Sequence, residues 1–255
     1  MIKPDIIISW PNNYDYPLWR QFVRDNRDKF SKIIVAFTQS FLGENYIEFI
    51  KKVMLDDVIF LETVPKTGQD WRDAAVNIAL EYSDAEWVWF TEQDFIIKKG
   101  FWENIDKILE ENKKTLIIAA YENIRMHPCC IFAQRFAINQ TRMDFGIVPN
   151  ELDHFGVFQQ DIENKQFLTA KIDPKTYNHL AGLSHNMRLV YDGVSPNHNP
   201  EEFKEYMKAC FEVKVPLDPR FESLFQRIIN VPKENKEAIG ERSTSLKKTV
   251  GESIG

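Results

Sequence analysis

The feature that most constrains the fold of this chain is the alternation of short apolar runs with helical patterns in its first half. Runs rich in β-branched residues occupy residues 5–9, 32–38, 58–64, 87–91 and 115–121. Helical patterns lie between them, at residues 16–26, 44–55, 71–82 and 101–112. Strands that alternate with helices in this way form a parallel sheet with both faces covered. The sequence therefore predicts an α/β fold with a mostly parallel, Rossmann-like sheet and helices on both faces.

The pattern changes in the second half of the chain. Residues 130–136 indicate one more strand, whereas residues 138–200 are rich in Asn, Asp, His, Pro and Gly, which predicts loops with short elements. Two amphipathic patterns follow, and the chain then becomes polar and charged. We therefore expect one domain over residues 1–232, with an irregular half from residue 126, and a flexible tail over residues 233–255.

Composition argues against several classes of protein. The chain has 255 residues, a formal net charge of −6 and a pI near 5.5. An acidic chain without a basic run lacks the positive face that nucleic acid requires, so we expect no nucleic-acid partner. The cysteines are Cys129, Cys130 and Cys210, and their spacing fits neither a disulfide framework nor a structural zinc site.

The apolar runs also bear on the location of the protein. The longest of them, such as residues 116–121, have the length of a strand and are too short to cross a membrane. Asp5 and Pro11 interrupt the first apolar stretch, which therefore does not resemble a signal peptide. Together with the unpaired cysteines, these features predict a cytoplasmic protein without a transmembrane segment. Attachment to the inner face of a membrane through a partner is left open.

The strongest chemical signal is the pair of carboxylates in Glu92-Gln93-Asp94, directly after the run at residues 87–91. Ligands of an open parallel sheet bind at the carboxyl ends of its strands. Two carboxylates at that position suit a hard divalent cation such as Mg²⁺ or Mn²⁺, which would bridge a nucleotide diphosphate. The alternative is that both are turn residues, with Asp94 as a helix N-cap.

The order of these motifs resembles the family-2 type of GT-A glycosyltransferases. A first strand and loop at residues 6–10 precede a helix that begins Trp71-Arg72-Asp73-Ala74-Ala75-Val76-Asn77, and a later strand leads into Glu92-Gln93-Asp94. The resemblance covers roughly residues 5–135. The first carboxylate is Glu rather than the Asp of the family, so the resemblance implies Asp94 as the metal ligand.

The resemblance implies a GT-A fold and a metal-dependent transfer of a sugar. The donor would be a nucleotide-sugar such as a UDP- or GDP-sugar, and the acceptor a hydroxyl group of a glycan, lipid or protein. Residues 1–125 would form the nucleotide-binding half and residues 126–232 the acceptor-binding half. The donor base, the donor sugar, the acceptor, the stereochemical outcome and the oligomeric state are left open.

The same resemblance assigns residues to the donor. Asp70 or Arg72 would face the nucleotide, and Asp70 is also predicted to cap the following helix. Trp10 would stack on a base, unless it is an aromatic residue of the core, and Arg72 would otherwise form an ion pair on its helix. The full set predicted to contact the donor is Ser9, Trp10, Asp15, Asp70, Arg72 and Glu92.

A histidine late in the chain completes the metal site in many GT-A enzymes. The segment at residues 179–186 contains His179 and His185. We favour His185, because Gly182 and Ser184 give the backbone freedom to fold over phosphates. His179 remains open, as does a structural or surface role for either side chain.

An inverting transferase also needs a carboxylate that deprotonates the acceptor hydroxyl. The resemblance places an Asp after a Glu, well downstream of the metal motif. Asp161 has about that position, but Gln160 stands where the family has Glu. Asp153 is the second candidate, and the alternative for both is a solvated loop acid.

The segment His127-Pro128-Cys129-Cys130 invites a metal site, which we reject at this stage. Adjacent cysteines rarely bind one ion, and the sequence has no second pair of cysteines. We expect Cys129 and Cys130 to be strand residues on the acceptor side.

The chain lacks the motifs of several other enzyme classes. It contains no Gly-x-Gly-x-x-Gly, no Walker A and no Gly-x-Ser-x-Gly motif, which argues against dehydrogenases, ATPases and α/β-hydrolases. The loop at residues 10–13 has no Gly, Lys or Arg, which argues against a nucleotidyltransferase. The remaining alternative from a different class is a catalytically silent α/β module that binds a nucleotide or carbohydrate.

Overall fold

The computed structural model describes residues 2–9, 25–37, 58–67, 69–92, 95–146 and 154–179. All of them lie in the first of two compact units, Met1–His179, and the second unit is Leu180–Gly255. The helical patterns at 16–26 and 44–55 lie largely outside the described residues, as do those at 201–211 and 220–229. The domain limits at 232 and the tail at 233–255 stay predictions.

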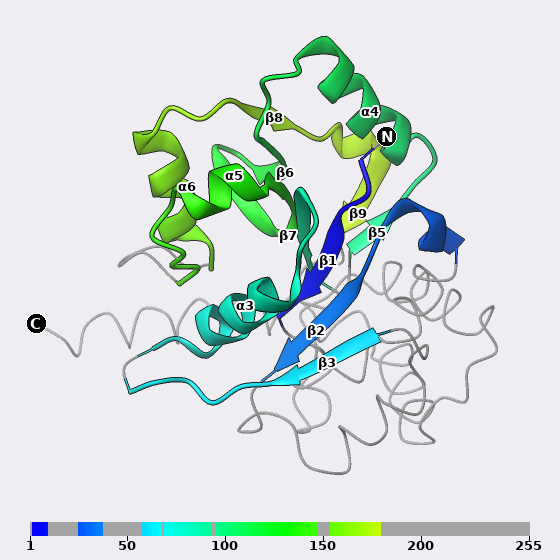
Figure 1. The fold of residues 1–255 in the computed structure, drawn as a ribbon. Coiled ribbons are helices and arrows are strands. Elements are labelled where there is room, and N and C mark those ends of the chain that lie inside the picture. Colours follow the sequence, from blue (N-terminus) through cyan, green and yellow to red (C-terminus); the bar gives the residue numbers. More distant parts are fainter. Residues whose placement is uncertain are drawn as a thin grey trace, which may run out of the picture. The chain divides into compact units, whose positions relative to one another are not determined.

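A seven-stranded mixed sheet forms the centre of the first unit (Figure 1). Its strands stand in the order β3-β2-β1-β4-β7-β6-β8. The first four are mutually parallel, β7 is antiparallel to both of its neighbours, and β6 and β8 are parallel. The strands are β1 (Asp5–Ile8), β2 (Ile33–Phe37), β3 (Val58–Glu62), β4 (Trp87–Thr91), β6 (Ile117–Glu122), β7 (Arg125–Gln134) and β8 (Thr169–Lys171).

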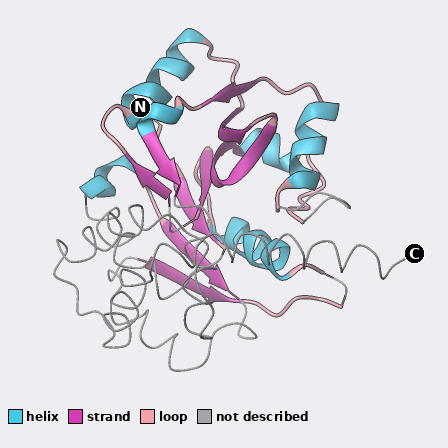
Figure 2. Ribbon diagram, turned by 180° about the vertical axis from the view of Figure 1, so that it is seen from behind, coloured by secondary structure: helices cyan, strands magenta, loops and turns pink. Residues whose placement is uncertain are grey.

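Helices cover both faces of this sheet, as the sequence predicted (Figure 2). Side chains of α3, α5 and α6 pack on one face, and side chains of α4 pack on the other. The predicted helices at 71–82 and 101–112 correspond to α3 and α4. The helices are α3 (Trp71–Tyr82), α4 (Phe101–Glu111), α5 (Arg135–Asn139) and α6 (Gly156–Asn164), with 3₁₀ turns η1 (Arg27–Lys29) and η3 (Pro174–Thr176). Among the described residues, no helix is long and apolar enough to cross a membrane.

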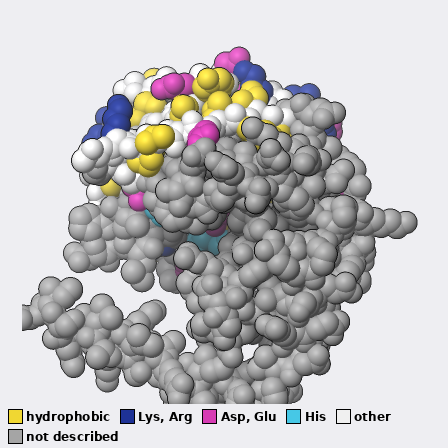
Figure 3. Space-filling view, turned by 90° about the horizontal axis from the view of Figure 1, so that it is seen from below, with side chains coloured by type: hydrophobic (Ala, Val, Ile, Leu, Met, Phe, Trp, Pro, Cys, Tyr) yellow, Lys and Arg dark blue, Asp and Glu magenta, His cyan; other side chains and the backbone are white. Residues whose placement is uncertain are grey.

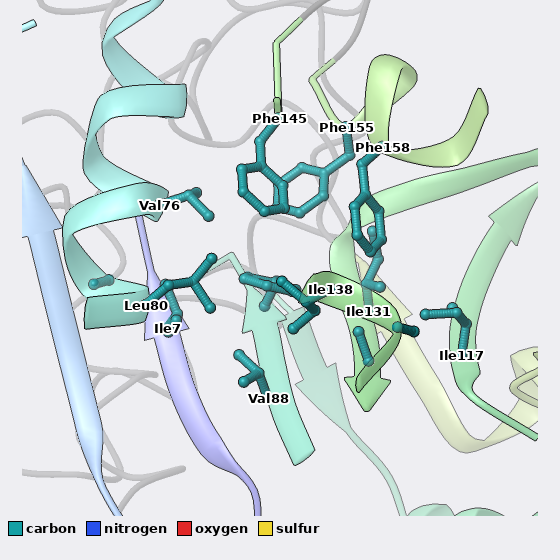
Figure 4. Packing of buried hydrophobic residues seen from close by; sticks show 14 of the residues in the cluster. Ile7, Val76, Leu80, Val88, Ile117, Ile131, Ile138, Phe145, Phe155 and Phe158 are labelled. Atoms are coloured by element: carbon teal, nitrogen blue, oxygen red, sulfur yellow. The ribbon is translucent and has the colours of Figure 1, made fainter. Parts of the chain in front are cut away.

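Strand β4 connects two aromatic cores because its side chains alternate between the faces. Trp89 points to one face, where it stacks on Phe132 at 4.7 Å and meets Trp102 edge-on at 5.6 Å. Phe90 points to the other face, where Phe145, Phe155 and Phe158 pack around it (Figure 4). Burial of such large rings stabilises the fold and fixes the end of β4 where Glu92 emerges.

The segment that the sequence predicted to be loops with short elements, residues 138–200, contains an ordered helix. Helix α6 packs Phe158 and Ile162 into the core. Two short strands, β5 (Phe95–Ile97) and β9 (Tyr177–His179), also form a separate antiparallel ladder in which Phe95 pairs with His179. This ladder brings the end of the described chain back to the end of β4.

Strand β7 is interrupted by a bulge. Ala119 of β6 pairs with Ile131 and Tyr121 pairs with Met126, so that two residue steps on β6 match five on β7. The extra residues lie within 127–130, where Pro128 lacks the N–H group that a regular ladder requires. The bulge therefore directs this segment away from the regular ladder, next to the end of β4.

Candidate functional site

A pocket lies at the carboxyl ends of β1 and β4. It is a small hollow that is partly open to solvent. Three residues predicted from the sequence to contact a donor, Ser9, Arg72 and Glu92, all line it. Its lining consists of Ile7, Ser9, Arg72, Phe90, Thr91, Glu92, Pro128 and Phe155. The structure thus brings together residues from the first strand, the start of α3 and the end of β4.

Glu92 carries the negative charge of this pocket. Its Oε1 lies 3.6 Å from Nη1 of Arg72, and its Oε2 lies 3.2 Å from Nε2 of His179. Burial raises the pKa of Glu92, but the hydrogen bond from His179 and the charge of Arg72 outweigh that effect and lower the pKa to about 2. Glu92 is therefore ionised at neutral pH.

Asp70 and Arg72 take different roles at the start of α3. The Asp70 carboxylate accepts hydrogen bonds from the N–H groups of Arg72, at 2.8 Å, and Asp73, at 3.3 Å. This confirms Asp70 as the predicted N-cap. His154 Nδ1 lies 3.5 Å from the same carboxylate oxygen. Arg72 lines the pocket and Asp70 does not, so Arg72 is the better placed of the two for a nucleotide.

The helix motif that carried the resemblance also has a structural use. Asp73 Oδ1 accepts hydrogen bonds from the amide of Asn77, at 2.9 Å, and from the N–H of Phe145, at 3.0 Å. The amide of Asn77 also donates to the carbonyl of Met143 at 3.1 Å. These bonds hold the segment with Phe145 against α3, which in turn fixes Phe155 at the pocket wall.

His179 is the late histidine that the structure places near the pocket. Its ring centroid lies 4.5 Å from that of His127, and His127, Cys129 and His179 have potential ligand atoms within 4.8 Å of one another. The segment at 127–130 therefore lies beside His179, which is about 50 positions later in the chain, so the spacing of residues in the sequence could not identify this cluster. This cluster differs from the pair of cysteines that we considered in the sequence, because two histidines accompany Cys129.

Asp161 is engaged elsewhere. It lies in α6, and its carboxylate accepts hydrogen bonds from the N–H of Arg142 at 2.7 Å, from Nε at 2.9 Å and from Nη2 at 2.8 Å. Burial raises the pKa of Asp161, but the bonds from Arg142 outweigh it and lower the pKa. Asp161 is not among the residues that line the pocket. Its role as a base stays a prediction.

Five predicted site residues lie outside the described residues. They are Trp10, Asp15, Asp94, Asp153 and His185. The assignments of these five residues stay predictions.

Charged side chains of both signs occur on the surface of the described residues. On the face drawn in Figure 3, acidic, basic and apolar side chains of the described residues are interspersed. Among the described residues that line the pocket, Arg72 is the cation, and its planar guanidinium group matches the oxygens of a phosphate. An anionic ligand of this pocket would therefore meet a positive group from this part of the chain.

No protein-family model and no curated protein sequence matches the chain. Solved structures do match it. A mannosyltransferase from Pyrobaculum calidifontis, in complex with GDP-Man and Mn²⁺, superposes with a TM-score of 0.51 and 14% identity, over 96% of this chain and 80% of that one. Glucosyl-3-phosphoglycerate synthase from Mycobacterium tuberculosis, in complex with Mn²⁺, UDP and phosphoglyceric acid, superposes with a TM-score of 0.50 and 11% identity, over 76% of this chain and 79% of that one. This chain therefore has the GT-A fold of these glycosyltransferases, which confirms the fold that the resemblance predicted.

Proposed function

We propose that the chain is a metal-dependent glycosyltransferase that moves a sugar from a nucleotide-sugar, such as a UDP- or GDP-sugar, to a hydroxyl acceptor. The observation that carries this proposal is the pocket in which Ser9, Arg72 and Glu92 meet. Ligands of parallel sheets bind at the ends of the strands where this pocket lies. The complexes of the two structural neighbours, which hold Mn²⁺ with UDP or GDP-Man, support the same function.

The described residues fit a divalent cation and a diphosphate. Glu92 offers ionised carboxylate oxygens, which are the ligands that Mn²⁺ and Mg²⁺ prefer. Arg72 offers a fixed fork of N–H donors to phosphate oxygens. Asp94 and His185 are the proposed metal ligands from outside the described residues, and His179, in contact with Glu92, is the alternative histidine.

The bound cation would supply Lewis-acid stabilisation of the negative charge on the diphosphate leaving group. Arg72 holds and neutralises the diphosphate from the side of α3. The charge of Glu92 attracts the cation and keeps the Arg72 guanidinium oriented across the pocket, 3.6 Å away. Phe90, Phe155 and Pro128 contribute an apolar wall on which the donor would rest.

The acceptor and its base are the least defined part of the proposal. Asp153 and Asp161 are both retained as candidates for the base. The three hydrogen bonds that Arg142 donates to Asp161 support a structural role for that residue, and so favour Asp153. A protein that binds the donor but transfers nothing would instead be the silent binding module.

Thermal unfolding in the presence of UDP, GDP, CDP and their sugars, with and without Mn²⁺, tests the proposal. A ligand that binds the folded state at about 100 times its Kd raises Tm by roughly 5 °C in a chain of this size. We expect a shift that needs both one nucleotide and Mn²⁺. Release of the free nucleoside diphosphate in the presence of acceptors then separates an enzyme from a silent module.

Substitutions at the pocket sharpen this test. Glu92→Gln and Arg72→Met should each remove most of the nucleotide-dependent shift. Glu62→Gln is the matched control, because Glu62 also ends a strand of the sheet but is exposed and does not line the pocket. The absence of a shift with every nucleotide, or an equal loss in Glu62→Gln, would contradict the proposal.

A further inference from the structure

The proposed transfer of a sugar gives no role to His127 and Cys129, and it has His179 only as the alternative to His185. Potential ligand atoms of these three residues lie within 4.8 Å of one another. Two neutral imidazoles and a thiolate form a ligand set that suits Zn²⁺ and Co²⁺, whereas Mg²⁺ and Ca²⁺ prefer oxygen. The chemistry of the cluster therefore differs from that of the carboxylates at the end of β4.

Two separate features of the fold build this cluster. The bulge of β7 interrupts the pairing of residues 127–130 with β6. The pairing of Phe95 with His179 then holds β9 beside that bulge. Cys129 is fixed by its carbonyl, which accepts hydrogen bonds from Thr91 Oγ1 at 2.9 Å and from the N–H of Glu92 at 3.3 Å. The three side chains are thus held by the backbone rather than gathered by chance on a mobile surface.

We propose that His127, Cys129 and His179 bind a divalent transition metal ion of the Zn²⁺ and Co²⁺ class, at a position beside the donor pocket. Ligand atoms around one tetrahedral ion lie roughly 3.5 Å apart, so small rotations of the side chains complete the site. Three protein ligands leave a fourth position, as in catalytic zinc sites. His179 serves this ion, and His185 remains the histidine for the donor metal.

The surroundings of the cluster favour a cation. Glu92 Oε2 lies 3.2 Å from His179 Nε2, so a carboxylate lies next to the position of the ion. Pro128, between two of the ligands in the sequence, lines the pocket, so the cluster lies next to the proposed donor site.

One hydrogen bond within the cluster changes when the ion binds. The N–H of Cys129 donates to Nδ1 of His127 at 3.1 Å. Ligation through Nδ1 replaces this bond, and ligation through Nε2 requires a proton on Nδ1, which also breaks it. One neutral hydrogen bond is a small loss compared with a bond between a metal and a thiolate. Binding releases the thiol proton, so the affinity for the ion rises with pH.

Titration of the full chain with Co²⁺, after removal of metals by a chelator and without nucleotide, tests the proposal. We expect a sulfur-to-cobalt charge-transfer absorption that saturates at one ion per chain. Cys129→Ser should abolish this absorption, and His127→Ala and His179→Ala should each weaken Co²⁺ binding about 10-fold or more. The matched control is Cys130→Ser, which changes the neighbouring buried thiol outside the cluster and should leave the absorption intact.

The outcomes separate this proposal from the proposed function. The absence of the charge-transfer absorption in the unsubstituted chain overturns it, even if Cys129→Ser fails to fold. An equal loss of the absorption in Cys130→Ser overturns it as well. The Mn²⁺-dependent rise of Tm with nucleotide is measured separately. If the unsubstituted chain shows no such rise, the result contradicts only the proposed transferase.

Discussion

Two carboxylates on neighbouring parallel strands show how differently this fold treats a negative charge at its two ends. Asp5 begins β1, and Glu92 follows the last residue of β4. The two carboxylates therefore lie at opposite ends of these parallel strands. Asp5 is fully buried and accepts hydrogen bonds from the N–H groups of Lys32, Asp84 and Ala85 and from the Ser83 hydroxyl. Glu92 is a quarter exposed, and its described side-chain contacts are with Arg72 and His179.

Asp5 and Glu92 differ in whether their hydrogen-bond partners can move to bind a ligand. Main-chain N–H groups are fixed by the strands and loops that carry them, so Asp5 can only hold β1, β2 and the turn after α3 together. Side chains such as Arg72 can exchange a carboxylate for a phosphate without a change of fold. Asp5 therefore stabilises the fold, whereas the side-chain partners of Glu92 are consistent with the ligand-binding role that we propose for it.

The largest expected effect is the loss of Asp5. Asp5→Ala leaves four buried or half-buried donors without their acceptor, so it should lower the free energy of unfolding by about 3–5 kcal/mol. Urea unfolding measures the change. Asp84→Ser is the matched control, because Asp84 serves Asp5 only through its main-chain N–H. If Asp5→Ala loses less than about 1 kcal/mol, Asp5 does not have the structural role that distinguishes it from Glu92.

The sequence predicted the elements whose apolar pattern is long and regular. The strands at residues 5–9, 32–38, 58–64 and 87–91 and the helix at 71–82 all have counterparts in β1 to β4 and α3. It missed α6 and β9. Helix α6 has few apolar positions and begins after Phe155, whose φ is +66°, and β9 is the polar tripeptide Tyr177-Asn178-His179. Such a strand forms because β5 lies beside it, and this long-range contact leaves no local pattern.

A third carboxylate, Asp161, resembles Asp5 more than Glu92. Its partner Arg142 donates from both main chain and side chain. Asp161→Asn should therefore lower the free energy of unfolding by about 2–3 kcal/mol and leave kcat unchanged at a temperature where the variant is folded. Arg142→Met should also lower the free energy of unfolding, and the double variant should be no worse than the more damaging single one. A loss of kcat without a loss of stability would instead identify Asp161 as the base.

The candidate site was predictable to the extent that each residue belongs to a recognisable local motif. Arg72 and Glu92 stand at a helix start and a strand end, and both positions can be read from the sequence. The link between Glu92 and His179 depends on the pairing of β5 with β9, and the cluster at His127 depends on the bulge of β7. Pro128 within an apolar run was the one local sign that this strand would not be regular.

The smallest of the three effects is the pH dependence contributed by Glu92. Its pKa is about 2 in the folded chain and near 4.5 otherwise, so the ionised form stabilises the fold. This contribution is fully present above about pH 4.5 and is lost as the pH falls toward 2. Glu92→Gln should therefore cost at most about 2 kcal/mol near neutral pH, since solvent screens a side chain that is partly exposed. The difference from the unsubstituted chain should shrink when urea unfolding is repeated at about pH 3. The opposite result would be a difference that stays constant between about pH 6 and pH 3. It would mean that Arg72 and His179 do not stabilise the charge of Glu92, and that packing and hydrogen bonds alone hold this carboxylate, as they hold Asp5.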